Sequence, residues 1–329
     1  MNKYKSILFI LIAVLSGGLI LFLISGAAKN THIETEKKTE SPSFLSMIVS
    51  SAPVPDFVEF CGERIPLGRM DMRERFDREL NSLIYLHSNI LLYFKRANRF
   101  FPVIDPILKK NDIPLDFKYL CVIESNLDTR AFSPAKAAGL WQFMDSTAKN
   151  YGLEITDEID ERYHIEKATE AACQYFKSAY QRYGKWTDVA ASYNAGMGRI
   201  SSAMQEQSVD SAFDLLLASE TSRYVFRIMA LKEIFENPEK YGIILKKENL
   251  YPLIPVHYIE VTSDIDNLAS FAKENGINYM QLKEFNVWLR RPVLKVAKGK
   301  SYRIAIPEKE DLYYSPDKIK IYDDRWVNQ

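Results

Sequence analysis

Apolar and polar positions divide the chain into distinct parts, and the first is an uncharged run of 23 residues from Ser6 to Ala28. A helix of that length reaches roughly 35 Å, enough to cross a hydrocarbon core about 30 Å thick. Lys3 and Lys5 precede the run, and positive charge on that side favours export of everything that follows. We therefore expect residues 1–28 to form an N-terminal transmembrane helix that acts as a signal-anchor. A cleaved signal peptide is the alternative.

The next segment, residues 29–55, begins with a polar and charged stretch that has almost no large apolar side chain. Such a stretch cannot bury enough surface to fold alone, so it predicts a flexible tether. From Asp71 onward, apolar residues recur at three- and four-residue steps, which is the period of an amphipathic helix. The pattern predicts one long helix within a helical N-terminal part, residues 56–110. Its apolar positions are Met72, Phe76, Leu80, Leu83, Ile84, His87, Ile90, Leu91 and Phe94.

Prolines interrupt the pattern after this helix and predict only a short helix around residues 107–110. Asp116 is placed to cap a further apolar helix, Phe117 to Ser125. The prolines are Pro102, Pro106 and Pro114.

A second clear apolar stripe at helical spacing ends at Gly184, a residue that commonly terminates helices. The chain is therefore predicted to be helical to about residue 240, with residues 111–245 as its main domain. The stripe consists of Ala168, Ala172, Tyr175, Phe176, Ala179 and Tyr183.

The pattern changes character after Gly242. Residues 256–261 and 302–307 alternate as strands do, and the second run is stopped by a proline. Two helical segments, residues 267–274 and 279–285, lie between them. This order predicts a small βααβ module over residues 250–310, followed by a tail, residues 311–329. The predicted fold class is thus mainly α with one small sheet.

Composition narrows the possible partners. The 43 Lys and Arg residues balance the 43 Asp and Glu residues, so no net field would gather a polyanion, and a nucleic-acid partner is not expected. The cysteines and histidines lack any spacing typical of a metal site, so we expect neither a metal nor another cofactor. These residues are Cys61, Cys121, Cys173, His32, His87, His164 and His257.

Familiar nucleotide and nucleophile motifs are also missing. Gly299-Lys300-Ser301 lacks the glycine that a phosphate loop needs five residues earlier, and Gly196-Met197-Gly198 lacks the third glycine of a dinucleotide fingerprint. No serine has the GxSxG surroundings of a hydrolase nucleophile. Dehydrogenase and serine hydrolase functions are therefore not supported.

One carboxylate has unusual surroundings. Glu124 follows the run Tyr119 to Ile123, which consists of large apolar residues and cysteine, on a helix that should be mostly buried. Burial disfavours the charged form, so the pKa of Glu124 should rise toward the range of a general acid. An exposed or structurally paired glutamate at a helix end is the alternative.

Four short motifs accompany this carboxylate in a fixed order. They are Glu124-Ser125, then Gly139-Leu140-Trp141-Gln142, then Tyr193-Asn194-Ala195-Gly196, and finally Glu220-Thr221 with Tyr224. In this order and spacing the sequence resembles the lytic transglycosylases of the goose-lysozyme-like group, most closely their membrane-bound D type. The resemblance implies a lysozyme-like helical catalytic domain, a peptidoglycan glycan strand as substrate, and a periplasmic location. The protein would be held at the membrane by residues 6–28, or secreted to the periplasm if the signal is cleaved.

The resemblance also implies the reaction. The family cleaves the β-1,4 bond from N-acetylmuramic acid to N-acetylglucosamine and leaves a 1,6-anhydro ring. Glu124 would act first as the acid and then as the base, because the nucleophile is the sugar's own 6-hydroxyl. The implied substrate-binding residues are Ser125, Ser133, Gln142, Tyr193, Asn194 and Tyr224.

Each supporting residue has a structural alternative. Tyr193 and Tyr224 could be core aromatics, Ser125 a helix-end cap, and Ser133 a turn residue before a proline. Two other functions also stay open. One is a hydrolytic muramidase, with Asp128 or Asp145 activating water, and the other is a non-catalytic peptidoglycan-binding protein. Nothing in the sequence identifies a protein partner.

The βααβ segment resembles a degenerate LysM module, a small fold that binds N-acetylglucosamine chains. It has Thr262-Ser263-Asp264 where such modules usually open with Gly-Asp-Thr, so a packing or spacer role is the alternative to glycan binding. Cys121 and Cys173 could form a disulfide in an oxidising compartment or remain two buried thiols.

Overall fold

The computed structural model describes residues 51–327. The predicted transmembrane helix, residues 1–28, and most of the predicted tether, residues 29–55, lie outside the described residues. Between residues 51 and 327, no helix has both the length and the apolar character needed to cross a bilayer.

The N-terminal part begins with a β-hairpin, which was not predicted from the sequence. Strand β1 (Phe57–Phe60) pairs antiparallel with β2 (Glu63–Pro66), with Phe60 opposite Glu63. Cys61 and Gly62 form the turn, and both have positive φ angles, as a two-residue hairpin turn requires.

Two helices follow the hairpin where one was predicted. Helix α2 (Met70–Ile84) is separated from α3 (His87–Lys110) by Tyr85 and Leu86. The prediction of a continuous helix was wrong because the apolar spacing continues across the break, which therefore leaves no trace in the pattern.

The predicted short helix at residues 107–110 was also wrong, since Pro102 and Pro106 lie inside α3. A proline inside a helix costs about 3 kcal/mol. Phe101, Ile104 and Leu108 beside them are fully buried, and burying a large apolar side chain contributes about 1.5–3 kcal/mol. Tertiary burial thus outweighs the loss of the helical hydrogen bonds.

Helix α4 has the predicted bounds, Phe117–Ser125, but not the predicted cap. Asp116 makes no side-chain capping bond. Its carboxylate instead accepts a hydrogen bond from the Cys61 backbone N–H (2.6 Å) and pairs with Lys232 (2.9 Å). Asp116 therefore connects α4 to segments distant in sequence.

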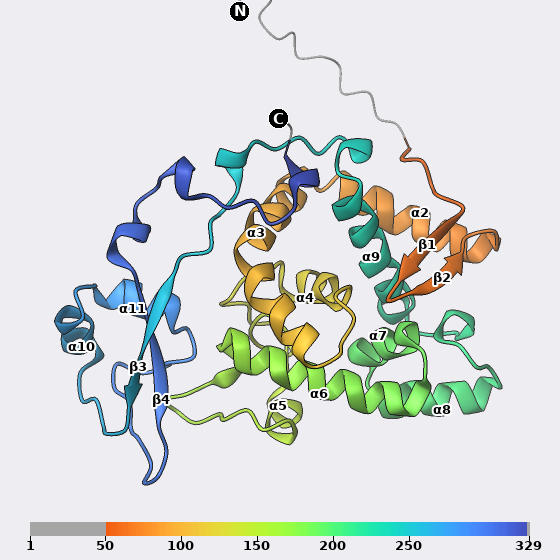
Figure 1. Cartoon of the computed structure of the whole chain (residues 1–329). Helices are drawn as coiled ribbons and strands as arrows, with labels where there is room; N and C mark the ends of the chain where they lie inside the picture. The colour runs from red at the N-terminus through yellow and green to blue at the C-terminus, as the bar shows by residue number, and fades with distance from the viewer. Residues whose placement is uncertain (1–50, 328–329) are drawn as a thin grey trace, which may run out of the picture. The chain divides into compact units, whose positions relative to one another are not determined.

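The remaining helices pack around α4, which lies among α3, α6 and α9 in Figure 1. Gly184, with φ +67°, ends α6 as predicted. Cys121 and Cys173 are fully buried free thiols, so the open question of a disulfide is answered in favour of thiols. The elements are α5 (Asp145–Asn150), η1 (Glu161–Tyr163), α6 (Ile165–Tyr183), α7 (Trp186–Ala195), α8 (Met197–Gln207), η2 (Ala212–Asp214), α9 (Ser219–Glu236), η3 (Glu239–Tyr241) and η4 (Lys247–Asn249).

The βααβ module forms as the sequence predicts. Strand β3 (Val256–Val261) pairs antiparallel with β4 (Tyr302–Pro307), from Val256 opposite Pro307 to Val261 opposite Tyr302. Between the strands lie α10 (Leu268–Glu274) and α11 (Tyr279–Phe285). The apolar core of the module also contains Ala138, Ile159 and Tyr163 of the helical domain, so the two parts share buried side chains.

The last described segment, residues 311–327, returns to the helical domain, and its end packs against α3 (Figure 1). Trp326 is buried, and its indole N–H donates to the Phe235 carbonyl (3.1 Å). Its ring stands edge-on to Phe94 at 5.3 Å. The turns of this segment are η5 (Lys309–Leu312), η6 (Pro316–Lys318) and η7 (Asp324–Trp326).

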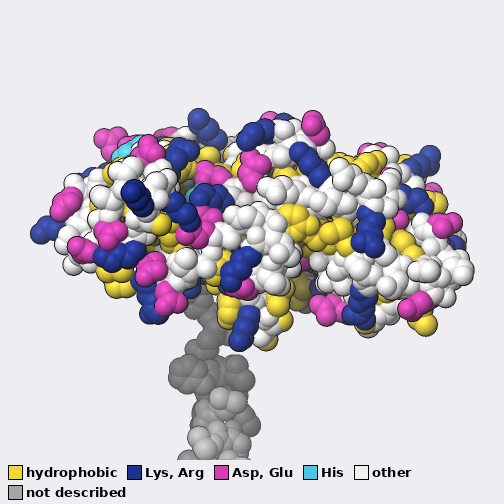
Figure 2. Space-filling model, turned by 90° about the horizontal axis from the view of Figure 1, so that it is seen from below, with side chains coloured by type: hydrophobic (Ala, Val, Ile, Leu, Met, Phe, Trp, Pro, Cys, Tyr) yellow, Lys and Arg dark blue, Asp and Glu magenta, His cyan; other side chains and the backbone are white. Residues whose placement is uncertain are grey.

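Charged side chains of both signs are interspersed over the face drawn in Figure 2. That face has no broad region of one sign. The distribution agrees with the balanced charge of the sequence.

Candidate active site

The site is built around the C-terminal end of α4. Glu124 occupies its last turn, and Asn126 ends the helix in the left-handed region (φ +56°), with its N–H donating to the Val122 carbonyl (2.8 Å). Leu127 also has a positive φ, so the chain leaves the helix sharply after Glu124. The side chain of Glu124 is half-buried. A half-buried carboxyl is removed from bulk water yet can still be reached by a ligand.

The pKa of Glu124 is raised from its ordinary value to about 7. Burial is the main cause, and the negative charge of Glu220 adds to it. A hydrogen bond from Tyr224 acts in the opposite direction. Near neutral pH both protonation states of the carboxyl are therefore populated. This suits a group that donates a proton and later accepts one.

Tyr224 comes from α9 and donates its hydroxyl to Oε1 of Glu124. The ring is buried, and burial together with the charge of Glu124 holds the pKa of the Tyr224 phenol well above its ordinary value. Tyr224 therefore remains a neutral donor to the carboxylate. The structure thus places Tyr224 beside the carboxyl, while its role in substrate binding stays a prediction.

Tyr193 comes from α7, and its hydroxyl donates to the Trp141 carbonyl (2.7 Å) rather than to the carboxyl. It nevertheless lies close to Glu124, whose charge helps to raise the pKa of Tyr193 after the larger effect of burial. Its ring packs edge-on against Tyr175 at 5.0 Å. Tyr193 therefore joins α7 to the loop that contains Trp141.

Asn194 follows Tyr193 and connects α7 to the first turn of α9. Its Oδ1 accepts a hydrogen bond from the Thr221 hydroxyl (2.9 Å). Among the described residues, none accepts a hydrogen bond from Nδ2 of Asn194, which leaves this donor for a ligand. Thr221 is thus a supporting residue whose role the sequence reading missed, although it lies in the last motif.

Gln142 lies in a tight loop with φ +50°. Its side-chain amide donates to the carbonyls of Gly139 (2.8 Å) and Ala131 (3.3 Å). Gly139 allows this loop to form, because it has φ +76° and a Cβ there would lie 1.8 Å from the Arg162 carbonyl oxygen. The amide N–H groups of Gln142 thus shape the loop, while its carbonyl oxygen has no partner within the part of the chain that the structure describes.

Arg162 supports the loop that contains Gln142. Its guanidinium pairs with Asp160 through two hydrogen bonds (2.9 and 2.7 Å) and donates to the carbonyls of Lys136 (2.9 Å) and Phe143 (3.2 Å). The supporting function of Arg162 could not be predicted, because it depends on contacts between segments 19 and 26 residues apart.

The two predicted serines have local partners. The Ser125 hydroxyl donates to the Cys121 carbonyl one turn earlier (3.1 Å), and its side chain is buried. The Ser133 hydroxyl accepts from the Ala137 N–H (3.0 Å) and so closes a turn. The structure therefore does not bring Ser125 into the open part of the site, whereas Ser133 is half-buried in the loop that contains Gln142.

Other carboxylates near the site differ in their surroundings. Asp128 pairs with Arg96 (3.4 Å) and Asp145 pairs with Lys149 (2.8 Å), and both side chains are about half exposed. Glu220, in the first turn of α9, is the carboxylate whose charge acts on Glu124. No cluster of three or more His, Cys, Asp or Glu side chains suited to a metal ion occurs in residues 51–327.

A separate cavity of about 310 Å³ lies between the helical domain and the βααβ module. Thr129 and His164 line it on one side, and Tyr258 and Trp288 line it on the other. Glu124 is not among its lining residues.

Two family profiles match the chain. The profile of the transglycosylase SLT domain matches residues 103–214, and that of the soluble lytic transglycosylase C-terminal LysM-like domain matches residues 257–310. The chain contains an SLT transglycosylase domain. The resemblance to lytic transglycosylases and the LysM-like character of the βααβ module are thereby confirmed. Tyr224 and Thr221 lie outside the SLT match, on the helix that follows it.

Curated relatives extend the similarity. Membrane-bound lytic murein transglycosylase D of Escherichia coli K12 is 30% identical over 285 residues, which cover 84% of this chain and 61% of that protein. The same protein of E. coli O6:H1 gives the same values. This chain thus spans about three fifths of the length of these relatives. In the crystal structure of the 70 kDa soluble lytic transglycosylase of E. coli, the similar part has 20% identity and a TM-score of 0.37, and covers 51% of this chain and 31% of that chain.

Proposed function

We propose that this protein is a lytic transglycosylase that cleaves the β-1,4 bond from N-acetylmuramic acid to N-acetylglucosamine in peptidoglycan and forms a 1,6-anhydro end. The observation that carries the proposal is the protonation behaviour of Glu124. It is a half-buried carboxyl with a pKa of about 7 and a neutral tyrosine donor beside it. Membership of the SLT domain family supports the same reaction class.

In this mechanism one carboxyl performs two proton transfers. Protonated Glu124 donates to the glycosidic oxygen while the bond from that oxygen to C1 breaks. The resulting carboxylate accepts the proton of the 6-hydroxyl while that oxygen forms a bond to C1. Glu124 ends in its original protonation state. Because the nucleophile belongs to the same sugar, its effective concentration replaces a second carboxylate that would activate water.

The substrate contacts follow from the side-chain groups that the fold leaves open. We assign Nδ2 of Asn194 and the carbonyl oxygen of Gln142 to acetamido or hydroxyl groups of the sugars, since neither atom has a partner among the described residues. The Ser133 hydroxyl accepts one hydrogen bond and can still donate to the glycan. Tyr224 and Tyr193 keep the carboxyl and the Gln142 loop in place. Ser125 supports the end of α4 rather than the glycan.

A hydrolytic muramidase on the same fold is the second candidate. It needs a carboxylate that activates water. Asp128 and Asp145 are paired with surface cations, whereas the charge of Glu220 acts on Glu124. If the reaction is hydrolysis, Glu220 is therefore the better candidate for the base.

The test is digestion of purified sacculi followed by mass spectrometry of the sugar ends. We expect 1,6-anhydro ends from the unaltered protein and no cleavage by Glu124→Gln, which removes the proton but little volume. Glu220→Gln should retain turnover within a few-fold, because in this mechanism Glu220 only adjusts the pKa of Glu124. Reducing ends that disappear in Glu220→Gln would support the muramidase instead. Binding of sacculi without cleavage would leave the non-catalytic alternative.

We further propose that the enzyme acts in the periplasm and is held at the membrane by residues 6–28. The uncharged run in the sequence and the words "membrane-bound" in the name of the E. coli relative support this location. Fractionation of cells that produce the full chain, before and after a high-salt wash, tests it. Release by salt would contradict an inserted helix.

A further inference from the structure

The two helices that meet at the active site are joined by only two polar contacts among the described residues. One is the hydrogen bond from Tyr224 of α9 to Glu124 of α4. The other is the ion pair between Lys232 of α9 and Asp116, the residue just before α4 (2.9 Å). Because the order of the partners is reversed, α4 and α9 run antiparallel.

These two contacts have the same spacing on both helices. Asp116 precedes Glu124 by eight residues, and Lys232 follows Tyr224 by eight. At 1.5 Å per residue, both intervals correspond to about 12 Å of helix. When Lys232 lies opposite Asp116, Tyr224 is therefore brought opposite Glu124.

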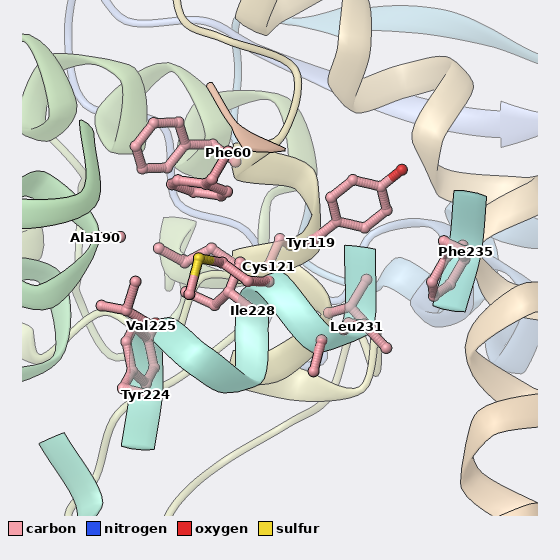
Figure 3. Close-up of a cluster of buried hydrophobic side chains, with 14 of the residues drawn as sticks. Phe60, Tyr119, Cys121, Ala190, Tyr224, Val225, Ile228, Leu231 and Phe235 are labelled. Atoms are coloured by element: carbon pink, nitrogen blue, oxygen red, sulfur yellow. The ribbon is translucent and has the colours of Figure 1, made fainter. Parts of the chain in front are cut away.

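The rest of the interface cannot define this alignment as sharply. Figure 3 shows buried apolar side chains at this interface, among them Cys121 of α4 and Val225, Ile228 and Leu231 of α9. Apolar packing is non-directional, and its free energy depends mainly on the area buried. A small slide of one helix along the other would therefore retain much of this contact while separating the tyrosine from the carboxyl.

The ion pair is built to be specific. Lys232 is buried, and its ammonium also donates to the Glu59 carbonyl (2.9 Å), while Asp116 accepts the Cys61 N–H. Because each partner also holds a backbone group, the pair has few alternative geometries, and the best attested role of such a largely buried pair is to fix register.

A second anchor holds α9 from its other side. Glu79 of α2 has no exposed surface and pairs with Arg223 (2.5 Å) and Arg227 (3.0 Å), which flank Tyr224 on α9. This anchor fixes α9 to α2, but it does not involve α4. The position of α4 along α9 still depends on Asp116 and Lys232.

We propose that the ion pair between Lys232 and Asp116 is a positioning element that sets the register of α4 on α9 and so holds Tyr224 against Glu124. It deepens the proposed function and rests on it, because it assigns the support of the same acid and base. Lys232 and Asp116 are positioning residues and do not touch the substrate.

The decisive measurement is the titration of Glu124 itself, followed by carboxyl ¹³C NMR and assigned by its loss in Glu124→Gln. The pKa of Glu124 responds to burial, Tyr224 and Glu220, and Lys232 does not act on it directly. Lys232→Met keeps the length of the side chain and removes its charge. We expect this variant to raise the pKa of Glu124, because the hydrogen bond that lowers it is weakened. Turnover should fall about tenfold or more, since small misplacements of catalytic groups are costly.

A double-variant comparison separates positioning from general loosening. In a Tyr224→Phe background, Lys232→Met should leave the pKa of Glu124 unchanged, because the contact through which it acts is already gone. Lys240→Met is the matched control, since it removes another ion pair of α9, with Glu233 (2.9 Å), at the far end of the helix. Lys240→Met should not shift the pKa of Glu124. Asp116→Asn removes the same ion pair with little change in shape and serves if Lys232→Met does not fold.

The inference is overturned if Lys232→Met and Asp116→Asn leave the pKa of Glu124 unchanged, or if they shift it equally with and without the Tyr224 hydroxyl. A shift in Lys240→Met of the same size would also overturn it. The titration needs no substrate. A protein that leaves sacculi intact would therefore disprove the proposed function, while the register of the two helices would still be tested.

Discussion

The pKa of Glu124 depends on three effects, two of which come from side chains of α9. Its own helix and the neighbouring core provide the burial that raises it, Glu220 adds a negative charge, and Tyr224 donates the hydrogen bond that lowers it. The sequence indicates the first effect, because large apolar residues precede Glu124. It does not indicate how far the hydrogen bond from Tyr224 offsets the rise in pKa, since Tyr224 is 100 residues away and its position depends on how two helices are aligned.

The raised pKa predicts that Glu124→Gln stabilises the folded protein in a pH-dependent way. Folding raises the pKa of this carboxyl from an ordinary value near 4.5 to about 7. Below pH 4.5 the group is protonated in both states and contributes nothing. As the pH rises toward 7 the unfolded state ionises first, so stability is lost, and the full cost is present above pH 7.

Glu124→Gln removes this cost. We expect its free energy of unfolding to exceed that of the unaltered protein by about 1–3 kcal/mol at pH 8 and to equal it near pH 4.5. Urea denaturation at the two pH values measures the difference. An equal gain at both pH values would mean that packing rather than ionisation is responsible.

Gly139 allows a second prediction at the residue scale. Gly139→Ala should destabilise the protein by more than about 3 kcal/mol, because the new Cβ would lie 1.8 Å from the Arg162 carbonyl and the backbone has a positive φ. Gly184→Ala is the control, since Gly184 also has a positive φ, in the left-handed helical region, but no atom within 4 Å of the added Cβ. It should cost only about 1–2 kcal/mol. Thermal unfolding of both variants would show whether the close approach or the φ angle dominates.

At the scale of elements, local signals were sufficient for some helices and strands. The bounds of α4 and α11 and of both module strands follow from apolar runs ended by residues with a clear conformational preference. Asn278, for example, caps α11 through a reciprocal pair of hydrogen bonds with Gln281 (2.9 Å each). Elements of this kind could be predicted because residues next to them in the sequence determine where they begin and end.

Helix α3 shows why other elements could not be predicted. Its two prolines are unfavourable locally, and only contacts with distant segments compensate for them. Asn98, four residues before Pro102, is buried and donates to the carbonyls of Tyr251 and Lys320 (3.0 Å each). These partners come from beyond the catalytic motifs. A prediction from local pattern alone therefore ended the helix too early.

At the scale of the whole described chain, the LysM-like domain and the SLT domain behave as parts of one structure. The Asp160 N–H donates to the Trp288 carbonyl (2.9 Å), and Ile159 forms an isolated bridge with Leu289. Asp160 in turn holds Arg162, which supports the Gln142 loop. Deleting residues 250–329 would therefore disturb the active site as well as any glycan binding, so binding by this domain must be tested with substitutions on its exposed surface.

The C-terminal segment, residues 311–327, contributes a buried tryptophan to the core of the helical domain. Trp326 packs against Phe94 of α3 and Phe235 of α9, and α9 also carries Tyr224. Trp326→Ala should lower the free energy of unfolding by about 3–5 kcal/mol, because it leaves a cavity in a fully packed site. Tyr314→Ala should change it by less than about 0.5 kcal/mol, since that side chain is 72% exposed in the same segment. Urea denaturation of the two variants compares a buried aromatic with an exposed one in the same C-terminal segment. Equal stability of both variants would show that residues 311–327 contribute no core and serve only as a tail.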